Sequence, residues 1–128
     1  MTMPFAYTPI TLDQRDEYLD RLARCPQKAS DYSFGNLWAW AEEYGLEWSW
    51  GRDCVWLRQT LPETRHWAPV GPWDGVDWPN CPRLKAIDRL TRVPEHLARL
   101  WERTLGSRVR LVEARGHWDY LYRVQDLV

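Results

Sequence analysis

The side chains that could carry chemistry are few and lie far apart in this sequence. The histidines and cysteines are His66, His96, His117, Cys25, Cys54 and Cys81. No CxxC pair is present, and no histidine stands at metal-ligand spacing from a cysteine. Because a zinc site needs a full set of convergent nitrogen or sulfur ligands, we predict no metal site. The cysteines are interpreted as buried or half-buried free thiols.

Standard signatures of catalysis are also missing from the sequence. It contains neither of the glycine-rich phosphate loops GxxxxGK[ST] and GxGxxG, and none of the motifs GxSxG, HExxH and SxxK. A general base needs a partner within hydrogen-bond reach, and the sequence does not place such a partner beside any of the histidines. We therefore predict no catalytic residue and no cofactor. Asp119 and Tyr120, in an alternating segment, are kept as candidate binding residues.

One predicted helix carries more aromatic residues than a single buried stripe requires. Segment 30–45 opens on cap residues and closes on a glycine, which suits a left-handed C-cap. Its apolar stripe, at spacings of three and four, is Phe34, Leu37, Trp38, Ala41 and Tyr44. Asn36, Trp40 and Glu43 recur at the same spacing on another face. We predict that Asn36 and Trp40 face away from the core and contact a ligand or a second lobe.

The elements that position these groups follow from hydrophobic periodicity. A short strand is expected over 5–10. Thr11 and Gln14 form a capping box for a helix that ends before Pro26. The apolar face expected on that helix is Leu12, Tyr18, Leu19, Leu22 and Cys25. Segments 46–50, 54–60 and 66–71 predict an antiparallel meander, in which the first alternates strictly and the last ends in a bend at Pro69 and Gly71.

The second half of the chain continues with the same kinds of element. Residues 72–82 predict a loop with at most one helical turn, and 86–91 a strand. Pro94 begins a helix that Gly106 ends, and strands are expected over 108–113 and 118–124. This order predicts one domain over 1–128. Its class is α+β, with a central, mostly antiparallel sheet flanked by about three helices.

Composition indicates a globular protein. The 128 residues are 45% hydrophobic and 27% charged. No apolar run approaches the roughly 20 residues of a membrane helix, and the N-terminus has no signal-peptide pattern, so a cytoplasmic location is expected. Residues 1–82 hold 7 basic and 12 acidic residues, and residues 83–128 hold 10 and 6. A net charge of −1 gives no strong nucleic-acid signal, although the basic last third leaves a phosphate-bearing partner open.

Tryptophan is unusually frequent in this chain. Ten Trp and six Tyr stand against two Phe. Such rings suit a half-buried sheet, a sugar-binding face or a stacking platform, and composition does not choose among these. A stand-alone Trp-rich module that binds a glycan or a peptide is therefore kept as an alternative function.

Four sequence blocks together resemble one known bacterial family. The first is Ser30-Asp-Tyr-Ser-Phe-Gly-Asn-Leu-Trp-Ala-Trp40, which looks like "S-E-Y-[ST]-F-x-N-L-x-x-W". Trp67-Ala-Pro-Val-Gly71 is similar to an aromatic-x-P-x-G strand end, and Val93-Pro-Glu-His-Leu97 to "V-P-E-x-[LF]". The stretch from Trp118 to Leu127 looks like "x-D-Y-[LV]-Y-x-x-x-D-L". The family is related to the C-terminal domain of lysyl-phosphatidylglycerol synthase.

The resemblance implies a fold and an activity class. In that family two GNAT-type lobes sit in tandem, as in Fem-type aminoacyltransferases, so a GNAT-like N-terminal half is expected here. Family members continue into a Lys/Arg-rich segment and a second lobe, and neither is expected within this sequence. The R/Q-x-x-G-x-G/A turn that GNAT enzymes use to hold coenzyme A is also absent from it. A catalytically incomplete lobe is expected, with a second lobe as partner in cis or by dimerisation. The blocks add Trp67, Gly71, Asp119 and Tyr120 to the substrate-binding or lobe-contact candidates.

Overall fold

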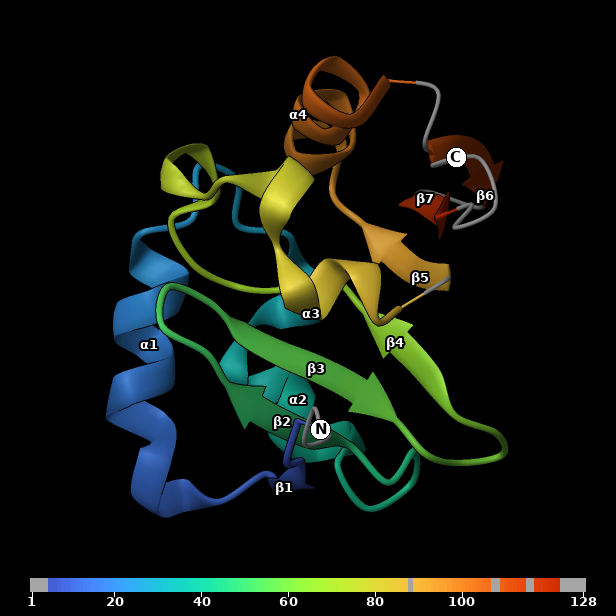
Figure 1. Cartoon of the computed structure of the whole chain (residues 1–128). Coiled ribbons are helices and arrows are strands. Elements are labelled where there is room, and N and C mark those ends of the chain that lie inside the picture. Colours follow the sequence, from blue (N-terminus) through green and yellow to red (C-terminus); the bar gives the residue numbers. More distant parts are fainter. Residues whose placement is uncertain (1–4, 88, 107–108, 115–116, 123–128) are drawn as a thin grey trace.

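The chain folds around one mixed sheet. The computed structural model describes residues 5–87, 89–106, 109–114 and 117–122, with side chains for 5–87 and 89–106. The strands are β1 (Thr8–Pro9), β2 (Glu47–Trp50), β3 (Val55–Gln59), β4 (Arg65–Trp67), β5 (Arg89–Val93), β6 (Val109–Ala114) and β7 (His117–Tyr122). They lie in the order β1-β2-β3-β4-β5-β7-β6 (Figure 1). Neighbouring strands pair antiparallel, except β4 and β5, which run parallel. The predicted α+β class is therefore confirmed.

Helices cover both faces of the sheet. The α-helices are α1 (Arg15–Ala23), α2 (Phe34–Trp40), α3 (Pro82–Lys85) and α4 (Glu95–Leu105), and the 3-10 helices are η1 (Leu12–Gln14), η2 (Ser30–Tyr32), η3 (Trp73–Gly75) and η4 (Trp78–Asn80). Tyr18 of α1 stacks on Trp48 of β2 at 5.8 Å. Trp78 of η4 contacts Trp56 of β3 at 6.3 Å on the opposite face, and Trp101 of α4 at 5.3 Å. Side chains alternate along a strand, so each face has its own aromatic layer.

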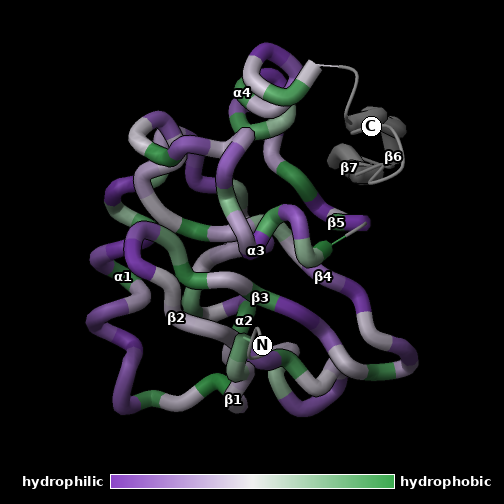
Figure 2. Tube along the Cα trace, in the orientation of Figure 1, coloured by the Kyte–Doolittle hydropathy of each residue, from purple (hydrophilic) through white to green (hydrophobic). Residues whose placement is uncertain are grey.

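The first helix is shorter than predicted, and fewer of its apolar residues are buried. It begins as η1 and continues as α1, and Thr11 makes no side-chain cap bond, so the capping box is wrong. Leu12 and Leu19 are exposed, whereas Tyr18 and Cys25 are buried. Figure 2 shows hydrophilic residues predominating along α1. Tyr18 is the one buried residue of α1, and its hydroxyl also donates a 2.5 Å hydrogen bond to the Tyr32 carbonyl oxygen.

The second helix begins later than predicted and exposes a different tryptophan. Ser33, not Ser30, is the N-cap, and its hydroxyl accepts a bond from the Asn36 N–H. Trp38, expected in the core, is 45% exposed and stacks on Phe34. Trp40, expected to face away from the core, is half-buried and packs against it. Because α2 has fewer than two turns after its cap, the apolar residues predicted over 30–45 do not all lie on one helix face.

The segment before β5 also differs from the prediction. Residues 72–82 form η3 and η4 rather than a loop with at most one turn, because Trp73 and Trp78 are both buried there. The strand expected over 86–91 starts later, as β5 at Arg89, and the short helix α3 precedes it over Pro82–Lys85. This makes four α-helices in the described residues instead of three. The helix predicted between Pro94 and Gly106 is confirmed as α4.

Candidate functional site

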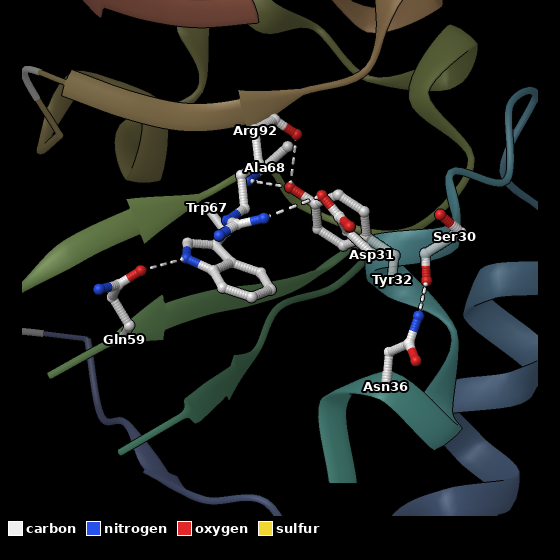
Figure 3. Close-up of polar contacts among 8 residues, drawn as sticks. All are labelled: Ser30, Asp31, Tyr32, Asn36, Gln59, Trp67, Ala68 and Arg92. Carbon is white, nitrogen blue, oxygen red and sulfur yellow. Dashed lines mark hydrogen bonds and ion pairs between the residues drawn. The ribbon is translucent and has the colours of Figure 1, made fainter. Parts of the chain in front are cut away.

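The ends of the parallel strands β4 and β5 are the first place to look for a site. Their pairing runs through His66–Leu90 and Trp67–Thr91 and then stops. Ligands often bind beyond the carboxyl ends of parallel strands. Here Tyr32 fills that position (Figure 3). Its hydroxyl accepts a 2.9 Å bond from the Ala68 N–H and donates a 2.9 Å bond to the Arg92 carbonyl oxygen. Burial raises the pKa of Tyr32 well above its usual value, so the donor proton stays in place.

Arg92 completes this arrangement from β5. Its backbone has φ of 60°, and the β5–β7 register shifts between Leu90 and Val93, which marks a bulge. The Arg92 guanidinium lies 4.8 Å from the centre of the Trp67 ring and forms a 3.1 Å ion pair with Asp31. We call Asp31, Tyr32, Trp67, Ala68 and Arg92 the Tyr32 network. It ties η2 to the ends of both parallel strands.

Two residues predicted to contact a ligand or a lobe belong to this region. The Trp67 indole is buried and donates to Gln59 Oε1 at 3.0 Å. Asn36 Nδ2 donates to the Ser30 carbonyl oxygen at 2.7 Å. Figure 3 shows both side chains directed at partners within the chain. Their hydrogen-bonding groups therefore serve the local fold.

The other predicted residues do not gather with them. A Cβ at Gly71 would lie 2.5 Å from the Asp53 carbonyl oxygen, so only glycine fits without a shift, and the Gly71 N–H donates to Cys25 Sγ at 3.1 Å. Trp40 contacts Tyr44 edge-to-face at 6.3 Å. The Asp119 and Tyr120 backbones lie in β7, opposite Val112 and Leu111. The side chains of Asp119 and Tyr120 lie outside the described residues.

A cleft that sequence analysis missed lies on the other face of the sheet. It encloses about 330 Å³ between the β2–β3 turn, η4 and the start of α3. We call it the Arg83 cleft. Its lining residues are Phe5, Gly51, Arg52, Asp53, Cys54, Trp56, Val76, Asp77, Trp78, Asn80, Cys81, Pro82 and Arg83. Most of the wall is apolar, and the charged groups are two arginines and two aspartates.

Arg83 is the half-buried cation of this cleft. Its Nη1 donates to Ser49 Oγ at 2.7 Å and its Nη2 to the Trp50 carbonyl oxygen at 3.3 Å. Its guanidinium carbon lies 4.2 Å from the centre of the Phe5 ring. Burial lowers the pKa of Arg83. Within the described residues it has no carboxylate at ion-pair distance.

The thiols near this cleft are poor nucleophiles or only partly accessible. Burial raises the pKa of Cys54 to about 12 and that of Cys25 to about 11, so both are protonated at neutral pH. Cys81 is half-buried and lines the cleft. No group of three or more histidine, cysteine, aspartate or glutamate residues suited to a metal ion exists in the described part of the chain.

The sequence contained weak signals for both regions. Asp31 and Tyr32 stand inside the motif block that drew attention to Asn36, but their partners lie about 36 to 61 positions away in the chain. Arg83 follows Cys81 and Pro82 directly, and its acceptor Ser49 lies 34 positions earlier in the chain. Neither partner set is visible from local spacing.

Comparisons with known proteins add one similar fold. No protein-family model and no curated protein matches this chain. It is similar to the crystal structure of a conserved protein of unknown function from Bacteroides thetaiotaomicron, with a TM-score of 0.67 and 19% sequence identity. The match covers 88% of this chain and 40% of that one. This similarity shows the fold alone. This chain therefore spans less than half of its structural neighbour.

None of the described helices is both long enough and apolar enough to cross a bilayer.

Proposed function

We propose that this chain is a catalytically incomplete lobe of an acyltransferase- or aminoacyltransferase-like protein and functions by packing against a second GNAT-like lobe. The observation that carries this proposal is the Tyr32 network. The motif residues behind the family resemblance, Tyr32, Asn36 and Trp67, bind partners inside the lobe. The place beyond β4 and β5 where a donor molecule would enter a parallel pair is occupied by a tyrosine hydroxyl.

The length of the structural neighbour also supports a lobe. That protein is longer, and this chain corresponds to 40% of it. A second lobe would come from the same polypeptide or from a second copy of this chain. A reducing cytoplasm is part of the proposal, because the three cysteines are free.

Calorimetry with coenzyme A and acetyl-coenzyme A tests catalytic incompleteness. We expect no saturable heat with either compound, because the Tyr32 side chain occupies the position beyond the carboxyl ends of β4 and β5. A Tyr32→Ala variant that remains folded would vacate that position and is the matched comparison. Saturable binding at one site per chain, or turnover of acetyl-coenzyme A by the unsubstituted chain, would contradict the proposal.

Light scattering tests the partner. A stable dimer supports a second lobe supplied by another copy, and a Lys/Arg-rich reading frame after Val128 supports one in cis. A monomeric chain whose reading frame stops at Val128 would remove the two-lobe arrangement altogether.

A Trp-rich binding module is the second candidate function, although fewer tryptophans are accessible than the composition suggested. Six tryptophans are buried in the described residues: Trp48, Trp56, Trp67, Trp73, Trp78 and Trp101. Trp38 is exposed and stacks on Phe34 at 6.1 Å with 14° between the rings, which makes it the ring available to a glycan. Fluorescence titration with a glycan and peptide panel, repeated on Trp38→Ala, tests this function. A response that Trp38→Ala retains would not come from this ring.

A further inference from the structure

We propose that the Arg83 cleft binds a small monoanion with a flat apolar body, of the chemical class of an aromatic carboxylate. The proposal goes beyond the lobe function and does not depend on it. It rests on a half-buried cation without an acidic partner among the described residues, on the aromatic walls around that cation, and on the charge balance of the cleft.

The unmatched cation is the first argument. Taking a guanidinium out of water is costly unless an anion or sufficient hydrogen-bond acceptors replace the water. Arg83 reaches two acceptors, and both are neutral: Ser49 Oγ and the Trp50 carbonyl oxygen. Arginine carries about five N–H donors, and these two bonds use one donor on each terminal nitrogen, so further donors remain for a ligand. A carboxylate bound there would compensate the charge and accept two parallel hydrogen bonds.

The walls of the cleft favour a flat apolar body on that carboxylate. Trp56 and Trp78 meet edge-to-face, at 6.3 Å and 74°, and both are buried. Phe5 lies against the guanidinium itself. The cleft volume of about 330 Å³ is at the small end of ligand pockets, which span roughly 300–1,000 Å³. One or two fused rings would fill it.

The charge balance favours a single negative charge. Arg52, Arg83, Asp53 and Asp77 all line the cleft, so the charged lining sums to zero. A doubly charged phosphate would meet the two aspartates at the rim, and like charges repel. A monoanion held by Arg83 gains the ion pair at less cost from those carboxylates. The forked guanidinium also suits a planar carboxylate.

Thiol protection and calorimetry test this assignment with three matched probes: 2-naphthoate, its neutral amide 2-naphthamide, and 2-naphthyl phosphate. Cys81 lines the cleft and is half-buried, while Cys25 is buried outside it. We expect 2-naphthoate to slow the alkylation of Cys81 by iodoacetamide in a saturable way. We expect the amide to bind about tenfold more weakly, because a hydrogen bond to a charged group is lost. The phosphate should also bind more weakly than the carboxylate.

Substitutions then assign the preference to one residue. Arg83→Gln should remove the preference for naphthoate over naphthamide. Arg58→Gln is the matched control, because Arg58 also stacks on a ring, that of Tyr7 at 4.0 Å, yet is ion-paired with Glu47 and lies outside the cleft. It should leave the preference unchanged. If Arg83→Gln does not fold, Arg83→Lys serves instead, and should weaken naphthoate binding while keeping part of the preference.

Several outcomes would overturn the proposal. Equal binding of naphthoate and naphthamide would show that the cation is not used. Absence of both calorimetric heat and Cys81 protection at millimolar naphthoate would show that the cleft is not a site for this class. Tighter binding of the phosphate would contradict the monoanion assignment. Coenzyme A binding is measured separately, so failure of the lobe proposal leaves these results intact.

Discussion

Arg92 and Arg83 make the same kind of contact with an aromatic ring and differ in what surrounds them. Arg92 lies on Trp67 and is ion-paired with Asp31 at 3.1 Å. Arg83 lies on Phe5 and donates to neutral oxygens. In the Tyr32 network the Tyr32 hydroxyl and the Arg92 guanidinium both bind partners within the network. In the Arg83 cleft the cation retains donors and faces open volume.

Polar residues therefore have two different roles in this fold: in one region they connect elements of the chain, and in the other they line a cleft. The Tyr32 network connects η2 with β4 and β5 and so determines how the sheet is held together. The Arg83 cleft holds a cation that has no carboxylate at ion-pair distance among the described residues. A stability measurement should therefore respond mainly to the network, and a binding measurement mainly to the cleft. The following predictions test that division, starting with the largest effect.

Gly71→Ala should destabilise the fold beside the Arg83 cleft, because Gly71 packs against Asp53 and Cys54, which line it. A Cβ there would meet the Asp53 backbone at the rim of the cleft, and the Gly71 N–H binds Cys25. Backbone atoms cannot move aside cheaply, so we expect a loss of about 3 kcal/mol in the free energy of unfolding. Urea denaturation measures it. The control Gly35→Ala meets nothing within 4 Å in helix α2, and should stabilise by about 0.5–1 kcal/mol.

Tyr32→Phe should destabilise the network without changing its shape. It removes one hydroxyl and leaves the Ala68 N–H and the Arg92 carbonyl oxygen without that partner. We expect a loss of about 2 kcal/mol, the cost of burying unsatisfied polar groups. Tyr44→Phe is the control, because the Tyr44 hydroxyl makes no hydrogen bond to the described residues. It should change stability by less than about 0.5 kcal/mol. Equal losses for the two variants would mean that the Tyr32 hydroxyl is not a bridge.

Alkaline pH should destabilise the cleft side through Cys54. Burial raises its pKa from 9.0 to about 12, so the folded state keeps a proton that the unfolded state releases. The associated stability is complete below about pH 9 and is lost as pH rises toward 12. By pH 10 the loss is about 1 kcal/mol. Urea midpoints at pH 8 and pH 10 under reducing conditions should differ less in Cys54→Ala. An unchanged difference would assign the loss to other groups, such as Tyr18 and Cys25.

Asp31→Asn should have the smallest effect of this series. The Asp31 and Arg92 side chains are 31% and 28% exposed, so solvent and salt screen the pair. We expect a loss of about 0.5–1 kcal/mol that shrinks with added salt. Asp20→Asn, which breaks the more exposed pair with Arg24, should cost less. A larger loss in Asp20→Asn would contradict the role assigned to Asp31 in the network.

Local pattern predicted much of the fold and little of the candidate site. The meander of β2, β3 and β4 and the helix from Glu95 to Leu105 were predicted because each has a regular period and clear ends. The parallel pairing of β4 with β5 was not, because it joins segments separated by η3, η4 and α3. The exposed ring of α2 was assigned to Trp40 and belongs to Trp38. Successive residues of a helix lie about 100° apart, and tertiary packing rather than local spacing decides which of them faces the core.

By itself the sequence determined the α+β class and the glycine-terminated helix α4. These follow from side-chain period and end signals, which are local properties of the chain. Tertiary structure decided that Tyr32 bridges two strands and that Arg83 donates to neutral oxygens, with no carboxylate at ion-pair distance in the part of the chain that is described. Both facts depend on residues more than 30 positions apart. A hydrogen bond or an ion pair is set by distance in space, and local spacing does not encode that distance.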